Sequence, residues 1–284
     1  MKRLLVPMFG DERDNTALGA AIKLAHTGGV HIDARLFLHD PSSVIPYVGE
    51  GIDASSAQRL FAAAQDNLQK RKESAQTNFD VWCAHEKINI GDRIENGHAS
   101  ADFEVVMGQL PNAIIPFARI ADINIFVRTD NIDDLDWSDL IQTALFDSGR
   151  PTLLVSSVVP ASIAKRIVIA WNGSAEAARA VAMTMPLLQQ AEAVFIITVD
   201  DEGDDHNPSK LAATLEMNGV TATPVSTNAD QASVSNALMA KAVKVHADMI
   251  IIGAYSHNRL GEMIFGGVTR DLQSRSDIPI LMVH

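Results

Sequence analysis

The sequence predicts an α/β fold class, with two tandem domains that are each a doubly wound parallel sheet. One observation behind this prediction is an internal repeat, because residues 2–7, which lead to Gly10, resemble residues 165–170, which lead to Gly173. Another is that apolar runs of strand length alternate with helical patterns along both copies. Matched strand-like runs in the same order indicate two copies of one domain.

The first copy, residues 1–157, is expected to alternate between strands and helices. Its apolar runs predict strands at residues 4–9, 34–39, 87–95, 123–127 and 152–156. Its helical patterns predict helices near residues 15–26, 54–85, 100–119 and 139–146. Continuous apolar runs of this length are typical of parallel strands that are buried on both faces.

The second copy, residues 165–284, follows a linker at 158–164 and runs the same course in fewer residues. An acidic loop at 200–208 and a short helix replace the long helix of the first copy. After the opening strand we expect strands at 194–199, 221–226, 249–252 and 280–283. The expected helices include 209–218, 233–246 and 268–274. The pair Ala121-Asp122 before a strand of the first copy recurs as Ala247-Asp248.

Length and charge exclude several classes of function. The 284 residues suffice for two domains that each bury a core. A formal net charge of −12 disfavours nucleic acid or an anionic membrane as partner, because phosphate polymers are bound by clustered Lys and Arg. The single Cys83 forms no internal disulfide, and we expect it to pack in a helix rather than sense redox state. The N-terminal run is too short for a signal peptide or membrane span, so we expect a cytoplasmic protein.

The candidate binding site follows the predicted strand at 249–252. Ligands of doubly wound sheets bind at the carboxyl ends of strands, and a glycine-rich turn onto a helix presents backbone N–H groups to an anion. Gly253 would let the backbone approach a ribose or phosphate. Gly266 and Gly267 would open the next helix, where Thr269 offers a hydroxyl. These residues fit a cradle for phosphate.

His257 and Arg259 are the nearby side chains that could add positive charge to this loop. Each also has a simpler interpretation. His257 could be a solvated loop histidine, and Arg259 could pair with Glu262 three residues further on. The glycine pair could form a tight turn that binds nothing.

These segments resemble the universal stress protein family. The resemblance rests on Gly253, on residues 266–269, on the turn at 171–174 and on the closing run at 278–283, and it covers both copies. The chain is therefore similar to a tandem universal stress protein, with Rossmann-like domains. In the family, ATP-binding members carry Gly, two residues, Gly, nine residues, Gly, then Ser or Thr. Here the second Gly is Ser256 and the final Ser or Thr is Gly267.

The resemblance implies that the C-terminal domain binds ATP or another adenine nucleotide. The family's aspartate after the first strand, which approaches the adenosine, corresponds to Asn172, and its adenine-contacting backbone corresponds to Val199. No catalytic residue and no metal ligand is expected. The candidate binding residues are Asn172, Val199, Gly253, Ser256, His257, Arg259, Gly266, Gly267, Val268 and Thr269.

The first copy has an acidic segment, residues 128–139, where the second has its glycine-rich loop. Carboxylates at this density would repel a triphosphate unless a divalent cation intervened. The spacing of an EF-hand is absent, so we favour a solvated loop in which Asp136 or Ser138 caps the next helix. The first copy is accordingly expected to be structural or to offer a surface to a partner.

The sequence predicts a stress-response protein whose nucleotide has a regulatory rather than a catalytic role. A weak ATP hydrolase and a nucleotide-free scaffold that acts through protein partners are the alternatives. Single-domain relatives in the family dimerise through the final strand, so the resemblance implies that residues 152–156 and 280–283 pair in an internal pseudo-dimer. A further homodimer through other surfaces stays open.

Overall fold

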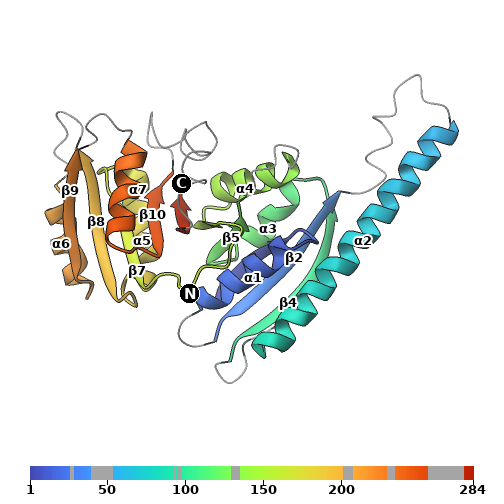
Figure 1. Ribbon diagram of the computed structural model, residues 1–284, viewed down its shortest axis with the longest axis horizontal. Coiled ribbons are helices and arrows are strands. Elements are labelled where there is room, and N and C mark those ends of the chain that lie inside the picture. Colours follow the sequence, from blue (N-terminus) through green and yellow to red (C-terminus); the bar gives the residue numbers. More distant parts are fainter. Residues whose placement is uncertain are drawn as a thin grey trace. The chain divides into compact units, whose positions relative to one another are not determined.

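The computed structural model shows two compact units (Figure 1). Met1–Phe126 and Ile132–Ser148 form the first unit, and Val127–Asn131 and Gly149–His284 form the second. The residues that the structure describes are 1–25, 29–39, 54–92, 94, 98–128, 135–200, 207–228, 234–254 and 278–284.

The described strands of the first unit form a parallel sheet in the order β3-β4-β2-β1-β5. These strands are β3 (Asn89–Ile90), β4 (Ser100–Gly108), β2 (His31–His39), β1 (Arg3–Met8) and β5 (Ile123–Val127). Strands β1, β2 and β5 are buried on both faces, as their apolar runs predict.

Helices cover both faces of this sheet. They are α1 (Arg13–Leu24), α2 (Ala54–Glu86), the short α3 (Ile115–Ala118) and α4 (Leu135–Asp147). Phe79 of α2 packs against Phe103 of β4, with ring centroids 5.7 Å apart. Phe117 of α3 packs at the same distance against Phe37 of β2. Because Phe103 is in register with Ala34, and Ala34 and Phe37 point to opposite sides of β2, α2 and α3 lie on opposite faces.

The helix expected at residues 100–119 is wrong. Residues 100–108 form β4, which pairs along its whole length with β2, and only Ile115–Ala118 are α-helical. The expected strand at 87–95 is reduced to the two residues of β3. Pairing with β2 overrides the local helical pattern, and the β-branched Val105 and Val106 suit a pleated strand.

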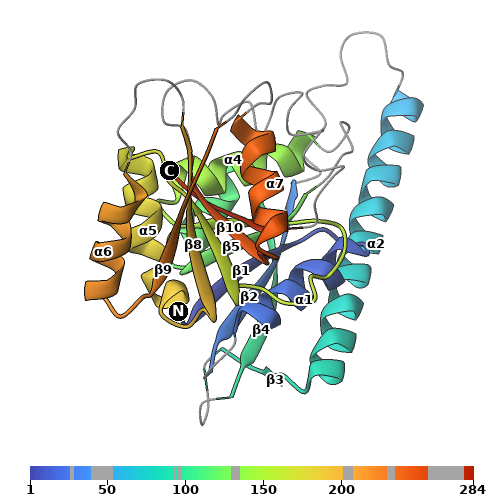
Figure 2. The same cartoon turned by 60° about the vertical axis from the view of Figure 1, so that its left-hand side comes forward.

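The described strands of the second unit have the order β6-β11-β10-β7-β8-β9. They are β6 (Thr152–Val155), β11 (Ile280–Val283), β10 (Met249–Gly253), β7 (Arg166–Ala170), β8 (Ala193–Asp200) and β9 (Ala222–Asn228). The helices are α5 (Ala175–Leu188), α6 (Pro208–Met217) and α7 (Val234–Lys244). Figure 2 shows α5 and α6 on one side of the strands and α7 on the other.

Strand β6 lies in the second unit, although the repeat assigns it to the end of the first copy. It pairs antiparallel with β11, with Leu153 opposite Leu281, and both side chains are fully buried. The arrangement of the two copies as a pseudo-dimer stays a prediction.

Matched aspartates perform the same task in the two copies. Asp122 accepts hydrogen bonds from the backbone N–H groups of Lys2, at 2.6 Å, and Arg3, at 3.1 Å. Asp248 accepts them from Lys165, at 3.2 Å, and Arg166, at 2.8 Å. Each carboxylate thus satisfies the backbone where the opening strand of its copy begins.

The other expected elements that the structure describes are confirmed, with ends shifted by a few residues. The 33-residue α2 corresponds to a helix of only 10 residues, α6, which accounts for most of the shortening of the second copy. The helix expected at 268–274 lies outside the described residues. Within the described part of the chain, no helix is both long and apolar enough to cross a membrane.

Candidate functional site

The second unit has a topological switch point between β7 and β10. From β7 the chain proceeds to β8 on one side, and it later returns to β10 on the other side of β7. The two strands are parallel, with Ile169 opposite Ile251, so their carboxyl ends lie side by side. The structure therefore brings Asn172, just after β7, and Gly253, the last residue of β10, to the same edge. Ligands of open α/β sheets bind at this kind of crevice.

The turn after β7 is built by its own side chains. The side-chain Oδ1 of Asn172 accepts a hydrogen bond from the N–H of Ser174 at 3.2 Å, and Gly173 has a φ of 69°. Ser174 then caps α5, because its Oγ accepts a hydrogen bond from the N–H of Ala177 at 3.2 Å. Asn172 thus has a structural role in addition to the predicted contact with a ligand.

Gly253 is close to the first turn of α5. A Cβ at this position would lie 2.3 Å from the backbone N of Ala177 and 2.5 Å from the backbone C of Glu176. The glycine is therefore required for the packing of β10 against α5, whether or not a ligand binds. Its expected approach to a ribose or phosphate stays a prediction.

Glu176 places a carboxylate in the first turn of α5. Its pKa is lowered by a hydrogen bond from its own backbone N–H and by Arg179, whose Nη2 lies 2.9 Å from Oε1. A carboxylate interacts favourably with the positive end of a helix. An anionic ligand would meet this charge if it approached the same N–H groups.

The remaining candidates lie outside the described residues. They are Ser256, His257, Arg259, Gly266, Gly267, Val268 and Thr269. Val199 lies near the carboxyl end of β8, the strand beside β7, and it is half-buried.

Part of the acidic segment of the first copy, residues 129–134, also lies outside the described residues. The chain is already helical at Leu135. Asp136 and Ser138 are therefore inside α4, and the prediction that one of them caps this helix is wrong.

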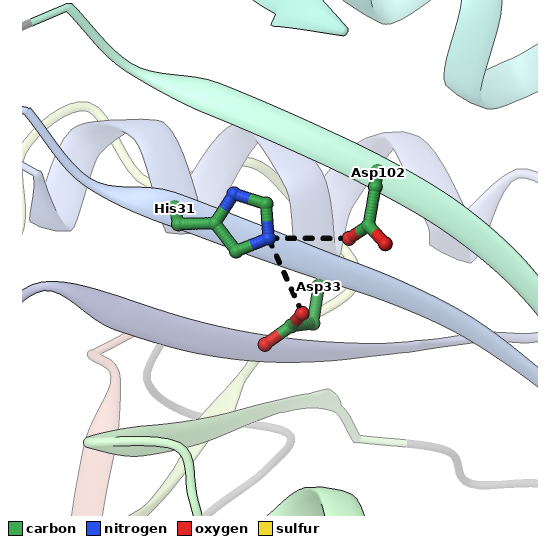
Figure 3. A group of neighbouring side chains, drawn as sticks. All are labelled: His31, Asp33 and Asp102. Carbon is green, nitrogen blue, oxygen red and sulfur yellow. Dashed lines mark ion pairs between the residues drawn. The ribbon is translucent and has the colours of Figure 1, made fainter. Parts of the chain in front are cut away.

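Sequence reasoning missed an ion network in the first unit (Figure 3). The Nε2 atom of His31 lies 3.3 Å from Oδ1 of Asp33 and 3.2 Å from Oδ1 of Asp102, and its Nδ1 lies 2.9 Å from Oγ of Ser100. Because His31 and Asp33 alternate along β2 and are in register with Ser100 and Asp102 of β4, all four side chains point to one face of the sheet.

Two arginines complete this network. The guanidinium of Arg3 binds both carboxylate oxygens of Asp33, at 2.6 and 2.9 Å. Nη2 of Arg35 contacts Asp33 at 3.0 Å and Asp102 at 2.8 Å, and its Nε lies 3.4 Å from Glu104. The network therefore joins three basic side chains to three carboxylates.

The network lies on the same face of the sheet as α3, a helix of only four residues. Asp33 and Arg35 are almost completely buried, with exposed fractions of 2% and 4%. Charges at this depth are tolerated when they are paired and hydrogen-bonded. The alternation of His31, Asp33 and Arg35 in the sequence could have indicated it, but the strand was expected to begin only at Ala34.

The charges hold each other in their ionised forms. Hydrogen bonds to Asp102 and Asp33 raise the pKa of His31 to about 9. Burial alone would raise the pKa of Asp102, but hydrogen bonds from His31 and Arg35 outweigh this and lower it to about 2. The three groups His31, Asp33 and Asp102 have the spacing of metal ligands. However, a cation there would have to displace Arg35 and the proton of His31, so we interpret the cluster as an internal ion network.

Cys83 is buried in α2. Burial and the neighbouring Asp80 raise the pKa of its thiol to about 12. The thiol is therefore protonated and unreactive, which supports the interpretation that it packs in the helix.

Residues 164–284 match the model of the universal stress protein family. A segment of 49 residues is 41% identical to the stress response protein NhaX of Bacillus subtilis (strain 168), and it covers 17% of this chain and 30% of that protein. The C-terminal region of the chain is therefore a universal stress protein domain. The chain spans less than a third of the length of that relative.

The whole chain has a fold similar to that of a solved universal stress protein. A universal stress protein from Archaeoglobus fulgidus DSM 4304 superimposes with a TM-score of 0.61 and 16% identity, over 99% of this chain and 95% of that chain. A putative universal stress protein from Pseudomonas aeruginosa UCBPP-PA14 gives a TM-score of 0.46 and 15% identity, over 100% and 93%. The tandem arrangement is consistent with the first of these likenesses.

Proposed function

We propose that this protein is a cytoplasmic stress-response protein that binds an adenine nucleotide in its second unit, for regulation rather than turnover. The observation that carries the proposal is that Asn172 and Gly253 lie at the neighbouring carboxyl ends of β7 and β10, at the switch point of the sheet. The family model that matches residues 164–284 supports it, as does the stress response named for the Bacillus relative.

The nucleotide would bind at the carboxyl ends of β7, β8 and β10. Asn172 and Val199 would face the adenosine, and the glycine-rich loop after Gly253 would receive the phosphates. Asn172 carries no charge where the family has an aspartate. We therefore expect weaker binding than in relatives that keep the carboxylate, because an amide is a poorer hydrogen-bond acceptor for ribose hydroxyls.

A non-catalytic role is favoured by the side chains at this edge. Asn172 cannot serve as a general base, and Glu176 is paired with Arg179. Phosphoryl transfer to water needs a residue that orients the attacking water and usually a bound metal ion. The weak ATP hydrolase is the alternative that fits least well.

The nucleotide-free scaffold is the stronger alternative. Asn172 and Gly253 both have structural roles that need no ligand. Asn172 accepts a hydrogen bond within its turn, and Gly253 leaves room for the backbone of α5. If these roles were sufficient, the edge would keep its shape with no ligand.

Mass spectrometry of the gently denatured protein tests the proposal. We expect an adenine nucleotide to be released, and we expect Asn172→Asp to retain more of it, because the carboxylate keeps the turn acceptor and adds charge. The matched control is Asn228→Asp at the end of β9, the edge strand of the same unit. Protein that releases no nucleotide, and that takes up none when ATP is added, would favour the scaffold.

A further inference from the structure

The outer edge of β4 is open along most of its length. Strand β3 pairs only with the first two residues of β4, since Asn89 is opposite Ser100 and Ile90 is opposite Ala101. From Asp102 to Gly108, β4 has β2 on one side and no described strand on the other. Such an edge can accept a strand from another chain.

Hydrogen bonds at the start of β4 show which backbone groups point outward. The carbonyl of Ala101 accepts from the N–H of Gly91 on the outer side, at 2.9 Å, whereas the N–H of Ser100 donates to Val30 on the side of β2. These directions alternate along a strand. The N–H and C=O groups of Phe103, Val105 and Met107 therefore point outward, and no group in the described part of the chain pairs with them.

The side chains of β4 leave this edge approachable. Met107 is 41% exposed, and Val105 and Val106 are half-exposed. Carboxylates usually protect an edge by repulsion, but Asp102 is bound to Arg35 at 2.8 Å, and Glu104 lies 3.4 Å from Nε of the same guanidinium. The ion network thus places a cation beside the two carboxylates nearest this edge and weakens their repulsion of another strand.

We propose that a second copy of this chain adds its own β4 to this edge, antiparallel, with a two-fold axis at Val105. Val105 then lies opposite Val105 of the second copy, and Phe103 lies opposite Met107. All three residues present outward N–H and C=O groups, so each opposed pair exchanges two hydrogen bonds. Asp102 lies opposite Gly108 and Glu104 opposite Val106, so no like charges are opposed.

Two registers closer to the start of β4 are less favourable. An axis at Phe103 would place Asp102 opposite Glu104 and would need the carbonyl of Ala101, which already binds Gly91. An axis at Glu104 would place that carboxylate opposite itself, and opposed like charges destabilise a strand pair. With the axis at Val105, β4 of the second copy ends at Gly108, beside Asp102 and one residue short of β3.

Self-complementarity identifies the partner as a second copy rather than a different protein. A two-fold interface needs one patch that matches itself, and residues 102–108 do so in hydrogen bonds, charge and length. The other sheet edge described in the chain, β9, contains Pro224, which has no N–H to donate. The β4 edge has no such protection.

Light scattering of the full chain at micromolar concentration tests the proposal. We expect twice the chain mass of 30.6 kDa for the wild type and a single chain mass for Val105→Pro. The monomer should tolerate this proline, because the N–H of Val105 does not bond to β2. The matched control Ser226→Pro removes an N–H on the same side of β9 as Pro224, and it should leave the dimer intact.

Cross-linking tests the register. Two residues in a hydrogen-bonded antiparallel pair have Cα atoms about 5.5 Å apart, which a disulfide can span. Val105→Cys should therefore form a disulfide-linked dimer under mild oxidation, whereas Ser226→Cys should not, and the native Cys83 is buried. A monomeric wild type, or a dimer that survives Val105→Pro and does not cross-link at Val105→Cys, would overturn the proposal.

Discussion

The need for a glycine at position 253 has two explanations. The sequence favours a close approach to a nucleotide, whereas the structure shows a close approach to the backbone of Glu176 and Ala177. Loss of ligand binding in a Gly253 variant would therefore not locate the ligand. Stability separates the two explanations, because packing against α5 acts without a ligand.

Gly253→Ala should lower the free energy of unfolding by about 3 kcal/mol, since the added Cβ overlaps backbone that cannot move cheaply. Urea denaturation of the ligand-free protein measures this change. Gly91→Ala is the matched control, because a Cβ there meets nothing within 4 Å, and it should change stability by less than about 0.5 kcal/mol. Equal stabilities for the two variants would contradict the packing explanation.

His31 should make stability depend on pH above neutrality. Its pKa is about 9 in the folded protein and 6.5 in the unfolded chain. Its contribution to the free energy of unfolding is therefore complete below pH 6.5 and is lost as the pH rises through 9. The loss should be about 1–2 kcal/mol, because the half-exposed Asp102 is partly screened by solvent. Urea denaturation at pH 6 and at pH 9.5 measures it. His31→Gln should remove this slope, and an unchanged slope in that variant would refute the assignment.

At the scale of elements, the sequence was sufficient to predict the segments that a continuous apolar run or a helical pattern marks locally. The apolar runs of β1, β5, β7, β10 and β11 and the long α2 are where they were expected. Strand β4 was mistaken for a helix because its pairing with β2 joins residues about seventy positions apart, which no local pattern reveals. The ion network was missed for the same reason, since Asp102 meets His31 only in the folded sheet.

The sequence predicted strands that end close to Asn172 and Gly253, but not the switch point between them. Asn172 follows β7 and Gly253 ends β10, and the structure brings them to one edge. The packing of α5 against Gly253 was not predictable, because it depends on the angle between a helix and a strand.

Strand β6 should promote self-association when it is separated from β11. Leu153 and Leu281 are fully buried beside each other, and burial of each side chain contributes roughly 1.5–3 kcal/mol. We therefore expect a fragment of residues 1–160 to self-associate. The fragment should carry Val105→Pro so that the β4 edge does not contribute. Light scattering that shows a soluble monomer would contradict the dependence of β6 on β11.

For the whole molecule, we predict that the turnover of ATP is slow or absent. With Asn172 in the position of a carboxylate, ATP hydrolysis should not exceed about one event per hour, far below the usual range of enzymes. A phosphate-release assay with and without Mg²⁺ measures it. Metal-dependent release at ordinary enzymatic rates, lost in His257→Ala or Thr269→Ala, would establish a hydrolase instead.

The central claim is that an adenine nucleotide binds once per chain, in the second unit. Isothermal titration of the full chain with ATP tests it most directly, because the stoichiometry distinguishes one site from two. We predict one site per chain, with binding weakened in Arg259→Ala and unchanged in Arg119→Ala of the first unit. Two equivalent sites per chain, or no binding at all, would contradict the account.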